Sequence, residues 1–165
     1  MQTMTDPTVD RPHVPGYGVP KTLKGTLPWS WARERLERAM VYRLATSGTD
    51  NAPHLNPIWG AWVNDRWYVE GGSTRWKRNL RENPQLAVNV EFGDEVVIVE
   101  GHAREMEISD GALAREILAG YAKYKAIGYE AEESNWTEGG LWELEPIRAF
   151  AWSSFPKDMT RYTFR

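Results

Sequence analysis

Two consecutive stretches with strand periodicity constrain the fold of this chain most. In QLAVNVEF (85–92), apolar residues occupy every second position from Leu86 to Phe92, which is the period of a strand with one buried face. Gly93 and Asp94 then supply a turn signal before a second apolar run, VVIVEGHAREME (96–107). Strands joined by so short a turn pair antiparallel, so an antiparallel sheet is expected.

Further patterns extend this sheet. Additional strands are predicted at residues 41–47, 53–63, 66–71 and 141–152, and the first two form a hairpin. Helices are predicted over residues 28–40, with Ser30 as the candidate N-cap, and over residues 110–125. Six strands with short turns and intervening helices predict a mainly β (α+β) fold, a six-stranded antiparallel barrel with peripheral helices.

The length and proline distribution predict a single domain preceded by an arm. A chain of 165 residues can bury one sizeable core. Residues 1–25 carry four prolines and no apolar run, so they are predicted to form an extended arm that is either disordered or wrapped around a partner. Residues 26–165 are then the domain. The lack of an apolar run also predicts neither a signal peptide nor a membrane span.

Composition narrows the class of protein. A net charge of −3 and a pI near 5.7 argue against nucleic-acid binding. The chain has no cysteine, so it forms no disulfide and suits a reducing cytoplasm, where we expect it. Nine tryptophans fit an aromatic ligand, a large interface or, alternatively, a tryptophan-rich core.

A basic stretch, GGSTRWKRNLRENP (71–84), follows the predicted strand at residues 66–71. Thr74 is a good N-cap residue for a short helix, and the cations crowd its first turns, where the helix dipole is already positive. Such a helix N-terminus with added arginine and lysine favours a phosphate. A solvated basic helix face is the alternative. The cations are Arg75, Lys77, Arg78 and Arg81.

Familiar catalytic motifs are missing from the chain. His13, His54 and His102 lie far apart in sequence, and no acidic set accompanies them, so no metal site is predicted. No side-chain nucleophile or carboxylate pair stands out either. If the protein is an enzyme, a bound cofactor must carry the chemistry, and no catalytic side chain is assigned.

The order of these segments resembles a known family. PHLNPIWGAWVNDRWYVEGGSTRWKRNLRENPQLAVNVEF, followed by VVIVEGHA, is similar to the pyridoxamine 5'-phosphate oxidase-like flavoproteins of the flavin and deazaflavin oxidoreductase superfamily. The resemblance covers roughly residues 30–165 and includes TRYTF at 160–164. Its most specific piece is T-R-x-x-R-N-L-x-x-N-P at 74–84. It implies an FMN-binding split β-barrel.

The resemblance also implies where a cofactor lies. The ring system would lie along Asn56, Pro57, Ile58 and Trp59, and the ribityl chain near Val69 and Glu70. The phosphate would meet Thr74, Arg75 and Lys77 or Arg78. Trp152 and Arg161 would reach the cofactor across the interface of a homodimer. Alternatively, Trp59 and Trp152 belong to the core and Arg161 is a surface charge.

Two departures separate the chain from the oxidases proper. Trp76 stands where those enzymes carry a lysine, and KDMTRYTF (157–164) lacks their terminal arginine and histidine segment. The resemblance therefore implies an FMN-dependent oxidoreductase that transfers hydride to or from a small organic substrate. The alternatives are a reductase that uses the 8-hydroxy-5-deazaflavin coenzyme of the F-420 type, or a non-catalytic flavin- or haem-binding protein. The loop at 129–140 is a candidate substrate lid.

FMN is preferred as cofactor because it needs only a compact phosphate site, which Thr74 and Arg75 offer. The deazaflavin has a longer anionic tail, which the further cations Lys77, Arg78 and Arg81 could receive.

Overall fold

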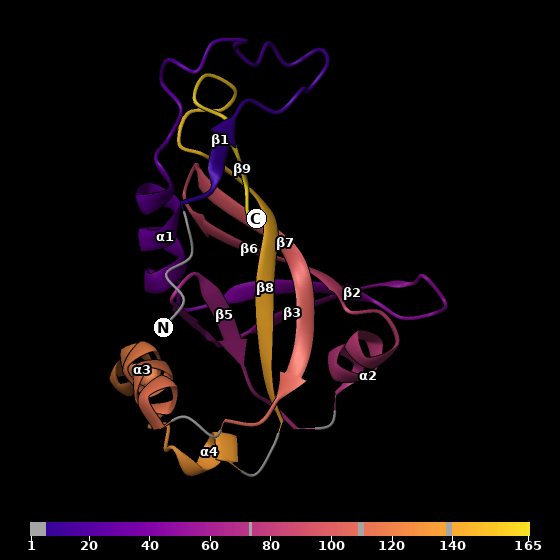
Figure 1. Ribbon diagram of the computed structural model, residues 1–165, viewed down its shortest axis with the longest axis vertical. Coiled ribbons are helices and arrows are strands. Elements are labelled where there is room, and N and C mark those ends of the chain that lie inside the picture. The colour runs from indigo at the N-terminus through magenta and orange to yellow at the C-terminus, as the bar shows by residue number, and fades with distance from the viewer. Residues whose placement is uncertain (1–5, 73, 109–110, 138–139) are drawn as a thin grey trace.

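The computed structural model describes residues 6–72, 74–108, 111–137 and 140–165. In these residues nine strands form one antiparallel sheet with helices packed around it (Figure 1). The strands are β1 (Thr8–Asp10), β2 (Tyr42–Ser47), β3 (Pro53–Ile58), β4 (Ala61–Val63), β5 (Arg66–Val69), β6 (Gln85–Phe92), β7 (Glu95–Met106), β8 (Leu141–Trp152) and β9 (Thr160–Thr163). The helices are α1 (Trp29–Arg38), α2 (Arg75–Glu82), α3 (Gly111–Tyr121), the 3-10 helix η1 (Ala122–Ile127) and α4 (Ser134–Thr137).

The sheet has the order β1-β9-β8-β7-β6-β2-β3, and β5 branches from β8 to pair with β4. The long strand β8 has β7 along one side. On its other side it pairs first with β5, at Trp142 to Leu144, and then with β9, at Arg148 to Ala151. One strand therefore serves two branches of the sheet, which leave it at opposite ends of β8 (Figure 1).

The six-stranded barrel expected from the sequence is wrong in two respects. The sheet is not closed, because among the described residues β3 pairs only with β2 at one edge and β1 only with β9 at the other. The structure has nine strands, not six. It adds two short strands that were not predicted, β1 and β9, and the stretch predicted as one strand at 53–63 is broken into β3 and β4. The mainly antiparallel sheet with a few helices is confirmed, as are the bounds of β6 and β8.

The break between β3 and β4 has a steric cause at Gly60. A Cβ atom there would lie 2.4 Å from Nε1 of Trp67 and 2.9 Å from the carbonyl oxygen of Tyr68. The hydroxyl of Tyr124 takes over the hydrogen bonds of the Gly60 backbone, accepting from its N–H and donating to its C=O, each over 3.0 Å. The chain can therefore turn a corner here without leaving buried backbone groups unpaired.

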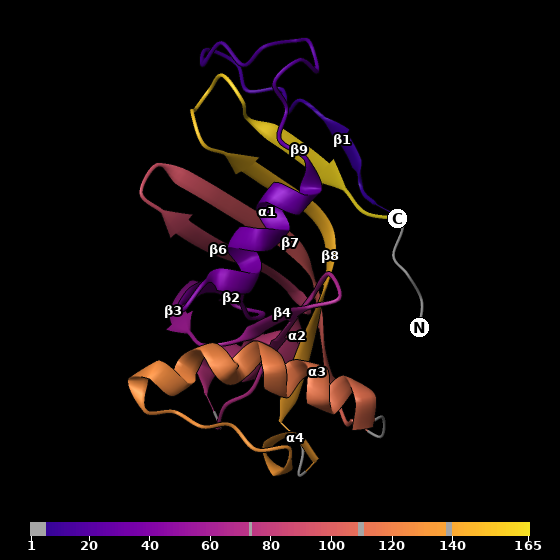
Figure 2. The same cartoon turned by 90° about the vertical axis from the view of Figure 1, so that its left-hand side faces the viewer.

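The helices differ from expectation mainly at their ends. Ser30 lies inside α1, and Pro28 is its N-cap, because proline suits the extended backbone that precedes a helix. The helix predicted at 110–125 ends at Tyr121 and continues as η1; position 110 lies outside the described residues. Figure 2 shows α1 crossing in front of the sheet, with α3 running along one end of the molecule.

Most of the tryptophans belong to the core. Six of the nine are buried, which supports the core explanation of their number. A main cluster joins α1 to the sheet, and a smaller one joins α3 and η1 to β4 and β5. The buried tryptophans are Trp29, Trp62, Trp67, Trp76, Trp136 and Trp142. Trp136 anchors the loop predicted as a lid, of which positions 138 and 139 lie outside the described residues.

The described part of the N-terminal arm is tied to the C-terminal strand. β1 pairs with β9, from Thr8 opposite Thr163 to Asp10 opposite Arg161. The guanidinium of Arg11 also donates a hydrogen bond to the carbonyl oxygen of Met159 over 2.7 Å. None of the helices in the described residues has the length and apolar character needed to cross a membrane.

Candidate functional site

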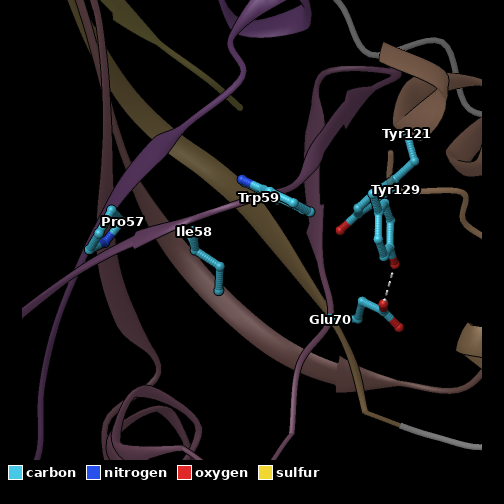
Figure 3. A pocket seen from close by; sticks show the side chains of 6 residues that line it. All are labelled: Pro57, Ile58, Trp59, Glu70, Tyr121 and Tyr129. Carbon is cyan, nitrogen blue, oxygen red and sulfur yellow. Dashed lines mark hydrogen bonds between the residues drawn. The ribbon is translucent and has the colours of Figure 1, made fainter. Parts of the chain in front are cut away.

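A cavity of about 330 Å³ opens where β3 and β5 end. It brings together four of the twelve predicted cofactor-binding residues, and adds two tyrosines that sequence reasoning did not assign to the site. Its lining consists of Pro57, Ile58, Trp59, Glu70, Tyr121 and Tyr129 (Figure 3). The cavity is therefore walled mainly by apolar and aromatic groups, as small-molecule sites usually are.

Trp59 is not a core residue, because 39 % of it is exposed. Its indole stacks on the ring of Tyr124 with centroids 5.0 Å apart and 17° between the planes. It meets the ring of Tyr129 edge to face at 5.3 Å. The exposed indole is thus held in one orientation at the rim of the cavity, where a flat ligand could lie against it.

Glu70 and Tyr129 lie next to each other in the wall of the cavity, and their side chains point toward one another (Figure 3). The Tyr129 hydroxyl donates a hydrogen bond to Oε1 of Glu70 over 2.9 Å. Burial, together with this carboxylate, raises the pKa of Tyr129 to about 12, so the phenol stays a neutral donor. The pair joins the end of β5 to the segment after η1. Tyr129 opens the acidic loop at 129–140, and that was the only signal in the sequence for its role.

Two predicted residues near the cavity do not line it. Val69 is buried in the main core, so only its backbone, paired with Trp142, can lie near a ligand. Asn56 lies on β3 opposite Leu44 of β2, and its side chain is half-buried. Val69 can therefore contact a cofactor only through its backbone.

The basic stretch forms α2, which packs against β2 and β3. Its apolar side is anchored by Trp76 and Leu80, both buried. Arg75 and Arg78 are exposed, and neither guanidinium forms an ion pair or hydrogen bond with any residue that the structure describes. These two cations are therefore available to an anion. Thr74 occupies the N-cap position, but its side chain does not cap the helix.

The other two cations of this stretch are already engaged. Lys77 is buried, and its Nζ donates a hydrogen bond to the carbonyl oxygen of Gly71, which fixes the turn between β5 and α2. Burial lowers the pKa of Lys77. Arg81 is paired with Glu105, with 2.9 Å between Nη2 and Oε1. The sequence could not separate these cations from the free ones because their partners come from other elements.

Trp152 and Arg161 are not brought to this cavity within one chain. Val69, next to Glu70, pairs with Trp142 near the start of β8, whereas Trp152 is the last residue of that strand. The strand rise of about 3.3 Å per residue places roughly 30 Å between its two ends. Trp152 packs edge to face on Phe155 at 5.6 Å, and Arg161 is paired with Asp10.

Comparison with known proteins places the chain in a family. The family model described as pyridoxamine 5'-phosphate oxidase matches residues 31–153. No curated protein matches the sequence. Several solved structures share the fold.

One is the conserved hypothetical protein Rv2991 from Mycobacterium tuberculosis (20 % identity, 77 % of this chain and 85 % of that one, TM-score 0.62). A second is a heme-binding protein from Mycobacterium smegmatis (22 % identity, 80 % of this chain and 56 % of that one, TM-score 0.61). A third is an F420 reductase (23 % identity, 71 % of this chain and 94 % of that one, TM-score 0.55). The family match spans most of the sheet, the cavity and the basic helix, so the chain belongs to the pyridoxamine 5'-phosphate oxidase family.

Proposed function

We propose that the protein is an oxidoreductase that transfers hydride to or from a small organic substrate through a bound flavin. The observation that carries this proposal is an aromatic cavity beside a helix with two arginines that pair with none of the described residues. Pro57, Ile58 and Trp59 supply the wall for a flat ring, and α2, which packs against the same strand, supplies Arg75 and Arg78 for a phosphate.

The residues present fit a flavin in shape and charge. A flavin ring is flat and aromatic, as is the face offered by Trp59. Its phosphate is anionic, which suits the free guanidinium groups of Arg75 and Arg78 and the N-terminal end of α2. When bound, a flavin supplies the hydride chemistry itself.

The chain's own residues would orient the ring and exclude water. Trp59 and Tyr129 border the cavity, and the hydrogen bond from Tyr129 holds the Glu70 carboxylate in place. Glu70 is the one acidic side chain among the described residues of the lining, so an anionic substrate is disfavoured.

FMN is the cofactor that the free cations favour. Lys77 and Arg81, two of the cations that a longer anionic tail would need, are already engaged by Gly71 and Glu105. With Lys77 and Arg81 engaged, Arg75 remains as a compact site for a single phosphate. The deazaflavin coenzyme is the second candidate, because Arg78 is also unpaired and could extend that site. One solved structure of the same fold is an F420 reductase.

A homodimer would complete the proposed site. Trp152 and Arg161 lie at the far end of β8 from the cavity, so they could contact a cofactor only in a second copy of the chain. We propose the cytoplasm as the location, since a chain without cysteine suits a reducing compartment.

The test is a spectroscopic titration of the purified chain with FMN, with the deazaflavin coenzyme and with haemin. Saturable FMN binding, followed by reduction with NAD(P)H and reoxidation by an added quinone or enone, is expected. Saturation by the deazaflavin alone would select the second candidate. Binding of FMN without turnover, or binding of haemin alone, would contradict the proposed oxidoreductase activity. The chain would then be a binding protein, like the heme-binding protein of the same fold.

A further inference from the structure

A second cavity, of about 420 Å³, lies between α1, the β4–β5 turn, α3 and η1. None of its residues belongs to the proposed cofactor site. Its lining combines an amine, two carboxylates and an amide with small and apolar groups. The residues are Glu37, Trp62, Val63, Asn64, Glu116, Ala119, Gly120 and Lys123.

Lys123 is held in this cavity without a counter-ion. Its Nζ donates hydrogen bonds to the Tyr42 hydroxyl over 3.0 Å and to the backbone oxygen of Glu37 over 3.1 Å. The same nitrogen lies 5.0 Å from the ring centre of Tyr42 and 5.2 Å from that of Tyr124. Among the described residues no carboxylate lies within ion-pair distance of it. An ammonium has three N–H donors, so one is left for the cavity.

The surroundings of Lys123 increase the fraction of neutral amine near pH 8 compared with an exposed lysine. Burial lowers the pKa of Lys123 to about 8. The Glu37 carboxylate raises this pKa, but by less than burial lowers it. Burial also raises the pKa of Glu37, while Arg33 lowers it. The titratable groups facing the amine are Glu37, Tyr42, Glu116 and Tyr124. Both phenols have raised pKa values and stay neutral at the pH where the amine loses its proton.

We propose that Lys123 is a covalent binding site for a small, uncharged aldehyde. The amine lone pair forms a bond to the carbonyl carbon while the carbonyl π electrons move to oxygen. A proton passes from nitrogen to that oxygen, and loss of water leaves a C=N bond. The step requires no oxidant or reductant. An unprotonated, desolvated lysine is the group that such chemistry uses.

The charge of the cavity sets the ligand class. Glu37 and Glu116 both line it, and Glu116 accepts a hydrogen bond from the Asn64 amide over 2.5 Å. Two carboxylates against one amine repel an anionic aldehyde. Trp62, Val63 and Gly120 provide a small apolar wall. An uncharged aldehyde of a few carbons is therefore preferred over one that carries a carboxylate.

The test is reductive trapping of the full chain at pH 8 with propionaldehyde and cyanoborohydride, followed by peptide mass mapping. Lys123 is expected to be alkylated about tenfold or more faster than Lys125, an exposed lysine two residues on that is paired with Glu130. The rate at Lys123 should rise with pH around 8. Lys123→Arg should abolish this adduct, and Lys125→Arg should leave it unchanged.

Glyoxylate, which carries a carboxylate, provides the comparison for ligand charge. It should label Lys123 more slowly than propionaldehyde, and Glu37→Gln should narrow that difference without loss of the fold, since the Glu37 carboxylate makes no hydrogen bond within the described part of the chain. Equal labelling of Lys123 and Lys125 would overturn the proposed site. Equal rates for the two aldehydes at Lys123 would overturn the ligand class.

Discussion

The Tyr129 hydroxyl donates a hydrogen bond to the Glu70 carboxylate, and this contact joins a strand end to a segment 59 residues later in the chain. The two residues are far apart in the sequence, so only the tertiary structure brings them into contact. The hydrogen bond holds the Glu70 carboxylate, the one acidic group among the described residues that line the proposed cofactor cavity, so Tyr129 is a positioning residue for that cavity.

Tyr129→Phe is expected to lower the free energy of unfolding by about 1 kcal/mol, the usual net value of a hydrogen bond, with somewhat more if Glu70 is left unpaired. The ring contact with Trp59 would be kept. Urea denaturation measures the change. Tyr17→Phe is the matched control, because Tyr17 is 62 % exposed and its ring meets that of Phe155 edge to face. An equal loss in both variants would contradict a specific role for the Glu70 contact.

Arg75→Ala is expected to weaken FMN binding by about 1.5–3 kcal/mol, the range for a lost charge-assisted contact. This corresponds to a rise in Kd of roughly ten- to a hundredfold. Fluorescence titration of the flavin gives the constants. Arg81→Ala removes a cation from the same helix that is already paired with Glu105, so it should change Kd far less. Similar losses in the two variants would remove Arg75 from the site.

Gly60→Ala is expected to destabilise the fold by about 1–3 kcal/mol, the usual cost of overpacking. The new Cβ would overlap the indole of Trp67 and the Tyr68 carbonyl, both of which are buried. Denaturant titration provides the measurement. Gly72→Ala is the control, since a Cβ there would have no atom of the described residues within 4 Å beyond its chain neighbours. A wild-type midpoint for Gly60→Ala would show that the corner between β3 and β4 tolerates a side chain.

Asp10→Asn is expected to remove a pH-dependent contribution to stability. Hydrogen bonding to Arg161 holds the pKa of Asp10 below its ordinary value of 3.8, so the ion pair stabilises the fold above that pH. The contribution is lost as the pH falls through the lower, folded-state pKa.

Both side chains of this pair are partly exposed, so the effect at pH 7 should be only about 0.2–1 kcal/mol. Urea unfolding at pH 7 and pH 3 measures it, and the difference between the variant and the wild type should be smaller at the lower pH. Asp94→Asn, at an exposed turn, is the control. A difference between wild type and Asp10→Asn that persists unchanged at pH 3 would contradict the assignment to this carboxylate.

Local patterns were sufficient for much of the sheet and for the basic helix. The alternation from Leu86 to Phe92 predicts β6 with its correct ends, because a strand with one buried face repeats every two residues. Asn64 and Asp65 both adopt positive φ, at 52° and 58°, in the turn that the sequence places there. Patterns fail at β1 and β9, which are too short to show a period. They form because β9 pairs with β8 and β1 then pairs with β9.

The sequence by itself determined which segments alternate, where the chain turns and which helix carries the cations, since these depend on neighbouring residues. The tertiary structure decided which cations are free, because the partners of Lys77 and Arg81 are contributed by the β5–α2 turn and by β7. It also decided that Trp59 borders a cavity while Trp67 fills the core. Both residues look alike in sequence, and only long-range packing separates a ligand wall from a buried side chain.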